Sequence, residues 1–170
     1  MFQYLLDTYE SETRKTEAVW GLFWDTDLNW RPDEKSRMVR ENFEHQLLSE
    51  RRFFGEFLGA PEPLPAAVLP TRKDAVSYKE RYVELALARL PFLAAQEPEW
   101  WLGRVQFFDV ERERIWIFWR RVLHTAHHRT QLTMYLRMMG RDVPAIYGPS
   151  ADQTWSGADP TNTVDAAGRR

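Results

Sequence analysis

The sequence predicts an all-α fold, an antiparallel four-helix bundle with an extended C-terminal tail. Four long stretches carry apolar residues at the spacing of three and four that is typical of helices. The connections between them contain the prolines and glycines at which helices end, and their lengths fit a bundle. With 170 residues, 44% of them hydrophobic, the chain can bury one sizeable core. We expect the bundle to occupy residues 1–150 and a partly disordered tail to occupy residues 151–170.

The first two helices are expected on either side of a proline. One is predicted from Phe2 to Phe23, before a break at Pro32, which disfavours helix at the residue ahead of it. The other is predicted from Ser36 to Leu58, with Gly59 as its C-terminal stop. A non-helical linker that crosses the end of the domain should follow, because four prolines fall within ten residues: Pro61, Pro63, Pro65 and Pro70.

The second half of the chain is expected to hold two more helices. Thr71 and Asp74 resemble a capping box that opens a helix through Ala95, which Pro91 should kink or shorten. The stretch from Trp100 to Phe108 is either an ordered loop or a short hairpin. The last helix is predicted from Val110 to Met139, with Gly140 and Pro144 ending it. The first half of the remaining segment should pack on the surface through these candidates: Val143, Ile146, Tyr147 and Trp155.

Composition and charge exclude several classes of function. The net charge of −2 gives no electrostatic reason to expect binding to nucleic acid or to an anionic membrane. The chain has no cysteine, which excludes disulfides and thiolate metal ligands. No uncharged apolar run approaches the roughly 18 residues of a membrane span, and the N-terminus does not resemble a secretory signal. These observations predict a cytoplasmic protein.

Three of the four histidines fall within five residues of the last predicted helix, at positions 124, 127 and 128. His124 and His128 are four residues apart and therefore lie on one face, about one turn from each other. That spacing allows both imidazoles to reach one divalent metal ion. His127 points about 100° away from His128 and is a poorer ligand. A third ligand would have to come from elsewhere, and His45, in the second predicted helix, is the remaining histidine.

The histidines belong to a longer stripe with helical spacing: Ile117, Arg121, His124, His128, Gln131 and Tyr135. Polar groups on such a stripe are costly to bury unless each is satisfied, and metal ligation would satisfy them. Gln131 and Tyr135 are then candidates for holding a ligand or contacting substrate. The alternatives are a solvated histidine face and, for the charged residues from Glu111 to Arg121, a salt-bridged surface in preference to an anion site. Glu41, one turn before His45, is a candidate metal ligand, a hydrogen-bond acceptor for a ligand, or part of a charged face, and the charged face is favoured.

The segment from Leu123 to Leu132, followed by Tyr135-Leu136-Arg137 and residues 143–150, resembles the C-terminal half of DinB/YfiT-like proteins. The segments Asn29-Trp30-Arg31-Pro32 and Glu44-His45-Gln46-Leu47 are similar to earlier parts of the same family. The resemblance covers nearly the whole chain, and its most specific element is His-x-x-x-His-Arg-x-Gln with one upstream histidine. It implies that His45, His124 and His128 form a metal-binding triad, with no ligand role for His127.

The resemblance further implies a homodimer that binds nickel, zinc, iron or manganese. Characterised members of that family include S-transferases and isomerases that use small thiols such as bacillithiol or mycothiol. Three neutral imidazoles leave a divalent ion its charge and an open position, which is typical of catalytic sites. Such an ion can activate either a thiol or a water molecule. Two hypotheses follow: a metal-dependent transferase or hydrolase with a small-molecule substrate, or a non-catalytic, stress-related binding protein in which the metal only staples the bundle.

Overall fold

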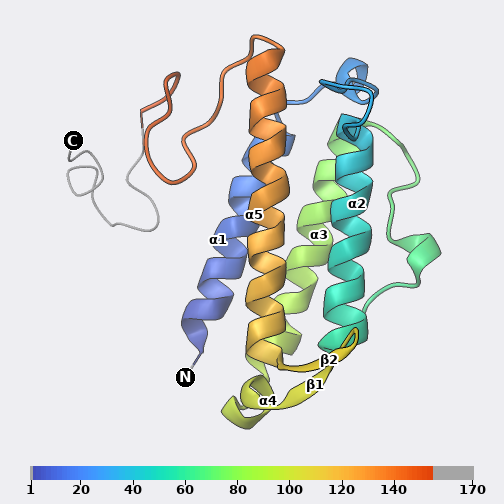
Figure 1. Ribbon diagram of the computed structural model, residues 1–170, viewed down its shortest axis with the longest axis vertical. Helices are drawn as coiled ribbons and strands as arrows, with labels where there is room; N and C mark the ends of the chain where they lie inside the picture. The colour runs from blue at the N-terminus through green and yellow to red at the C-terminus, as the bar shows by residue number, and fades with distance from the viewer. Residues whose placement is uncertain (1, 155–170) are drawn as a thin grey trace.

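The computed structural model describes residues 2–154 and confirms the predicted all-α class. Its helices and strands are α1 (Gln3–Trp20), α2 (Val39–Arg52), α3 (Ala75–Ala94), α4 (Pro98–Leu102), β1 (Arg104–Phe107), β2 (Val110–Glu113) and α5 (Arg114–Met138). The four long helices form the bundle, and α4 with the β1–β2 hairpin covers one end (Figure 1). Most of the expected tail, residues 155–170, lies outside the described residues.

Two helices run in each direction: α1 and α5 one way, α2 and α3 the other (Figure 1). Ring contacts agree, since Trp20 at the end of α1 stacks on Phe43 near the start of α2 and packs on Tyr82 in the first half of α3. Because α2 and α3 are parallel, the linker between them returns along the length of the bundle. The expectation that it crosses the end of the domain was wrong.

The ends of the first three helices differ from the predicted ones for local reasons. Asp74 is itself the N-cap of α3: its carboxylate accepts a hydrogen bond of 2.7 Å from the Ser77 amide, so the helix begins after Asp74 and not at Thr71. Pro91 does not end α3, which continues to Ala94. A π-helical turn, Phe53–Phe57, extends α2 until Gly59, whose φ of +74° ends it as predicted.

The last long helix begins four residues later than predicted. Residues 110–113 form β2 and pair antiparallel with β1, with Phe107 opposite Val110 and Arg104 opposite Glu113. The hairpin alternative for the preceding stretch was therefore correct from Arg104 onward, and the hairpin extends into the predicted helix. Residues 100–102 were expected in the same loop or hairpin, but they belong to α4. The alternating charges of residues 111–114 are compatible with either structure, so pairing with β1 decides which one forms.

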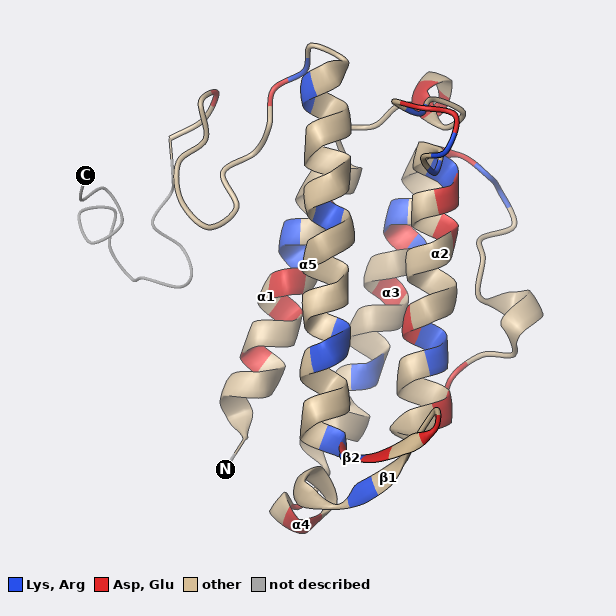
Figure 2. Cartoon of the chain, viewed as in Figure 1, with Lys and Arg blue, Asp and Glu red and all other residues tan. Residues whose placement is uncertain are grey.

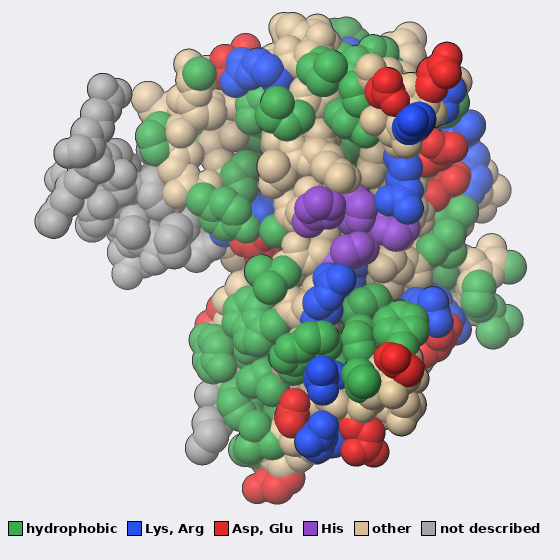
Figure 3. Space-filling view, viewed as in Figure 1, with side chains coloured by type: hydrophobic (Ala, Val, Ile, Leu, Met, Phe, Trp, Pro, Cys, Tyr) green, Lys and Arg blue, Asp and Glu red, His purple; other side chains and the backbone are tan. Residues whose placement is uncertain are grey.

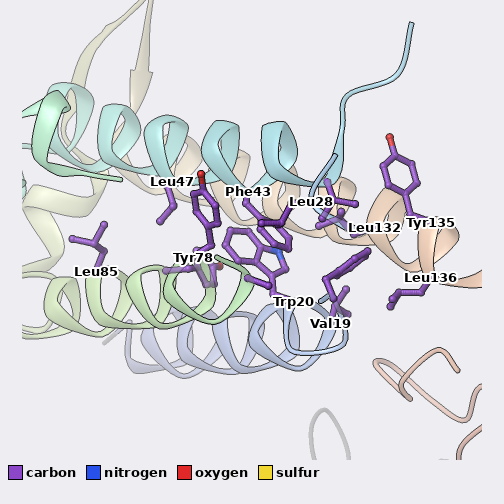
Figure 4. Packing of buried hydrophobic residues seen from close by; sticks show 14 of the residues in the cluster. Val19, Trp20, Leu28, Phe43, Leu47, Tyr78, Leu85, Leu132, Tyr135 and Leu136 are labelled. Carbon is purple, nitrogen blue, oxygen red and sulfur yellow. The ribbon is translucent and has the colours of Figure 1, made fainter. Parts of the chain in front are cut away.

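The apolar core consists of two clusters of buried side chains. One surrounds Trp20 and Phe43, whose rings are 4.1 Å apart, and it includes the start of α3 and the end of α5 (Figure 4). The other surrounds Phe54 and Phe118 near the hairpin end of the bundle. Within the described part of the chain, no helix is both long and apolar enough to span a membrane.

Buried charges connect the two clusters. Charged positions occur along the middle of all four long helices (Figure 2). Glu50 of α2, 1% exposed, accepts hydrogen bonds from Arg89, from the Tyr9 hydroxyl and from the Thr125 hydroxyl. The Oε1 atom of Glu50, which accepts from Thr125, also lies 3.6 Å from the guanidinium of Arg121, which is fully buried. The prediction that Arg121 belongs to a salt-bridged surface was wrong, because α2 covers it.

A second buried pair fastens the segment after α5 to α1. Arg129 donates to the Glu12 carboxylate at 2.6 Å, and the Tyr147 hydroxyl donates to the same carboxylate at 2.6 Å. Val143 and Ile146 pack on the core, as expected for the first half of this segment. Of the four docking candidates, Trp155 lies outside the described residues.

Glu12→Gln should destabilise the protein at neutral pH and lose that effect in acid. Burial by itself raises the pKa of Glu12, but the Arg129 charge and the hydrogen bonds from Lys15, Tyr147 and Arg129 lower it below its usual value. A lowered pKa stabilises the fold above the unfolded carboxyl pKa of about 4.3, and the gain disappears as pH falls through the folded pKa. Urea unfolding should show a gap of about 1–3 kcal/mol at pH 7 that narrows below pH ~4. A gap independent of pH would contradict this account.

Candidate metal centre

Two helices bring three histidines together at mid-length of the bundle. His45 comes from α2, and His124 and His128 come from successive turns of α5. One ring nitrogen of each lies within 4.8 Å of those of the other two. The ring centroids are 4.5 Å apart for His124 and His128, and 4.6 Å apart for His45 and His128. Three imidazoles at these distances can converge on a single ion.

Hydrogen bonds orient the two α5 rings. The Gln131 amide oxygen lies 2.8 Å from Nδ1 of His128. Because an amide oxygen only accepts, Nδ1 of His128 carries the proton and Nε2 keeps its lone pair. That Nε2 lies 3.2 Å from Nε2 of His124, so the two nitrogens already point at the same small volume. Gln131 thus orients the His128 ring through Nδ1 and leaves Nε2 free to face the other histidines. Metal-binding histidines are usually oriented by such a hydrogen bond to the nitrogen that does not bind the metal.

His45 contributes the observation that best tests whether a metal fits. Its Nε2 is buried and has no hydrogen-bond partner among the described residues. A buried polar nitrogen without a partner is costly unless something else satisfies it. A divalent cation bound between the three rings would do so.

The protein also keeps the three rings neutral. Burial lowers the pKa of His45 to about 4, helped by the charges of Arg37 and Arg121. Burial and the Arg121 charge lower the pKa of His124 to about 3. For His128, burial and nearby positive charges outweigh a hydrogen bond to Gln131 and lower the pKa to about 4. All three rings are therefore unprotonated at neutral pH, the state that metal ligation requires.

The other residues that the sequence singled out have separate positions. His127 is exposed and lies 3.2 Å from the Gln131 amide nitrogen, beside the three-histidine cluster and outside it. Glu41 is exposed, and its carboxylate accepts from the Met38 amide at the start of α2, which is a helix-capping role. The Tyr135 hydroxyl donates to the backbone carbonyl of Arg37 at 3.0 Å, so Tyr135 fixes the segment that carries Arg37.

Arg121 is the site residue whose importance the sequence reasoning missed. Its guanidinium contacts Nδ1 of His124 and donates to the Gln46 side-chain oxygen at 2.7 Å, which ties α5 to α2 beside the histidines. The signal was present, because Arg121 lies three residues before His124 in the same polar stripe. Its charge favoured the surface interpretation, and only the position of Glu50 shows how a buried arginine is balanced.

Two hollows open beside the histidines. The first, of about 600 Å³, is lined by His45 and His124 together with Phe53, Phe107 and Phe108; we call it the aromatic hollow. The second, of about 520 Å³, is lined by all four histidines and by Arg37; we call it the polar hollow. Arg120 lines both. On the surface the histidines form one patch bordered by basic side chains, with apolar side chains below (Figure 3).

Comparison with known proteins agrees with this fold. The model of the DinB family matches residues 1–159. This chain belongs to the DinB family. The resemblance expected from the sequence is thereby confirmed at the level of the family. No curated protein matches the sequence closely enough to serve as a relative.

Solved structures show the same DinB fold. A DinB-like protein from Bacillus cereus ATCC 10987 has a TM-score of 0.75 and 17% identity, with 86% of this chain and 97% of that chain covered. A DinB-like protein from Bacillus subtilis has a TM-score of 0.65 and 18% identity, with 83% and 96% covered. At these identities the likeness concerns the fold.

Proposed function

We propose that this DinB-family chain is a metal-dependent enzyme that acts on small molecules, with a divalent ion held by His45, His124 and His128. The observation that carries the proposal is the convergence of three imidazole nitrogens within 4.8 Å of one another, beside an open hollow. Three neutral ligands on two helices would leave at least one coordination position for substrate.

The donor set narrows the choice of metal. Imidazole nitrogens suit zinc, nickel and iron, whereas manganese prefers oxygen ligands. Among the described residues, no aspartate or glutamate lines either hollow beside the cluster. We therefore favour nickel, zinc or ferrous iron over manganese among the four metals that the family resemblance implies.

The reaction that we propose is transfer of a low-molecular-weight thiol to a small electrophile, or hydrolysis. A bound divalent ion would supply Lewis-acid activation of the thiol or water. The chain itself contributes the orientation of His128 by Gln131. The absence of cysteine from the sequence fits a thiol that arrives as a cosubstrate.

The alternative is a non-catalytic protein in which the metal only links α2 to α5 and so stabilises the bundle. That hypothesis needs a fourth protein ligand and a closed site. Glu41, the candidate for that role, caps α2 with its carboxylate, and two hollows adjoin the histidines. These two observations favour the enzyme.

The spectrum of the cobalt-substituted protein tests whether the site is open. Addition of 2-mercaptoethanol or azide should shift the d–d bands, because a ligand entering an open position changes the coordination of the cobalt ion. His128→Ala should abolish the response, and His127→Ala, the matched control on the same helix, should keep it. A spectrum that ignores thiols and azide would mean a closed site and would favour the scaffold hypothesis.

We further propose that the chain forms a homodimer, as the family resemblance implies. The outer face of α5 supports this, since it leaves large apolar side chains exposed: Trp116, Leu123, Met134 and Met138. Exposed apolar residues aligned on one helix face are typical of protein interfaces. Light scattering of the purified protein gives its mass in solution and tests the proposal.

A further inference from the structure

The aromatic hollow has a lining of mixed chemistry. Phe53, Phe107 and Phe108 provide aromatic surface, and Phe53 lies almost parallel to His124, with the ring centroids 6.5 Å apart. Its volume, about 600 Å³, falls within the range of small-molecule sites, roughly 300–1,000 Å³. The hollow can therefore hold the flat apolar part of a ligand while another part of that ligand reaches the histidines.

The charged side chains that line the two hollows, other than the histidines, are arginines. Arg52 and Arg120 line the aromatic hollow and Arg37 lines the polar one, whereas no acidic residue in the described part of the chain lines either. Arg52 pairs with Glu56 at 3.1 Å. Arg37 and Arg120 have no ion-pair partner within residues 2–154. Arg120 lies one helical turn before His124 on the same face. A divalent ion would add to this positive charge, so an anion is the ligand that balances it.

Phe108 supplies an independent observation. It occupies the first central position of the two-residue turn between β1 and β2, with a φ of +53°. That position favours glycine, and a bulky aromatic residue there is an outlier. Phe108 is 54% exposed, lines the aromatic hollow and packs on Phe57 and Phe107. Strained residues of this kind cluster at ligand sites, because the side chain is needed there.

We propose that the aromatic hollow binds an aromatic or flat apolar molecule that carries an anionic group, carboxylate or phosphate. The anionic group lies at Arg120 beside the histidines, and the apolar part packs against Phe108 and Phe107. The inference rests on the proposed function, since it assigns the substrate class of that site. The arginine and aromatic contacts nevertheless belong to the chain alone, so they can be tested with and without metal.

The test uses 2-naphthylacetate, 2-naphthyl phosphate and the uncharged 2-naphthylacetamide, titrated into chelator-treated full-length protein and followed by NMR. Both anions should bind at least about tenfold more tightly than the amide, because charge-assisted hydrogen bonds to arginine are the strong ones. Whichever anion binds more tightly identifies the preferred group. Arg120→Gln should remove most of the preference for the anions, and Arg14→Gln, an exposed arginine of α1 with the same change of charge, should not.

Phe108→Gly separates a binding role from a structural one. Glycine suits the turn, so the melting temperature should stay the same or rise, while both anions should bind several-fold more weakly. Equal binding of the anions and the amide, an unaffected Arg120→Gln variant, or failure of all three probes to bind would overturn the inference. Repeating the titration with Zn²⁺ separates this inference from the metal proposal. A protein that fails to bind metal would still give the expected result in its chelator-treated form.

Discussion

His45→Ala is expected to reduce the divalent metal retained by the purified protein from about one ion per chain to nearly none. The change removes the ligand that comes from α2 and leaves two imidazoles on one helix, too few to hold an ion firmly. It also removes the connection between α2 and α5, so the stabilisation that metal gives the wild type should be lost. Metal content after dialysis, measured by mass spectrometry, and melting temperatures with and without Zn²⁺ give the two readouts.

His127→Ala is the matched control for the metal prediction. His127 is exposed, adjoins His128 in sequence and lies outside the three-histidine cluster. Its replacement should leave both metal content and the zinc-dependent rise in melting temperature unchanged. Full metal retention in His45→Ala would remove α2 from the site and with it the proposed coordination.

Glu50→Ala is expected to cost about 3–5 kcal/mol of unfolding free energy, the largest stability effect that we predict. Glu50 is 1% exposed and balances two buried arginines, Arg89 at 2.5 Å and Arg121 at 3.6 Å. Removing the carboxylate leaves Arg121 buried with no acidic partner among the described residues, and takes from Arg89 one of its two acidic partners. Urea unfolding at neutral pH measures the loss.

A surface pair provides the comparison for Glu50. Glu17 pairs with Arg14 at 2.9 Å on the exposed side of α1, and exposed pairs contribute little because water screens them. Glu17→Ala should therefore change the unfolding free energy by less than about 1 kcal/mol. A Glu50→Ala variant as stable as Glu17→Ala would contradict the prediction, because it would show that water solvates the arginines in place of Glu50.

Much of the fold could be read from the sequence because local patterns carry it. The spacing of apolar residues predicted the bundle, and Gly59 and Gly140 were correctly expected at helix ends, where their φ values are positive. The patterns failed where a distant partner decides the structure. Residues 110–113 form a strand that pairs with β1 and not the first turn of the last helix. The direction of α3 depends on the path of the long linker between α2 and α3.

The sequence by itself determined the candidate ligands: two histidines one turn apart on a helix, and the one histidine that lies outside that helix. Only the tertiary structure decided that His45 faces them and that its Nε2 is buried without a hydrogen-bond partner among the described residues. It also decided that Arg121 is buried against Glu50, and that Arg37 and Arg120 border hollows that no acidic residue of segment 2–154 lines. The reason is that spacing along a helix fixes which residues share a face, whereas the packing of helices far apart in sequence fixes what that face meets.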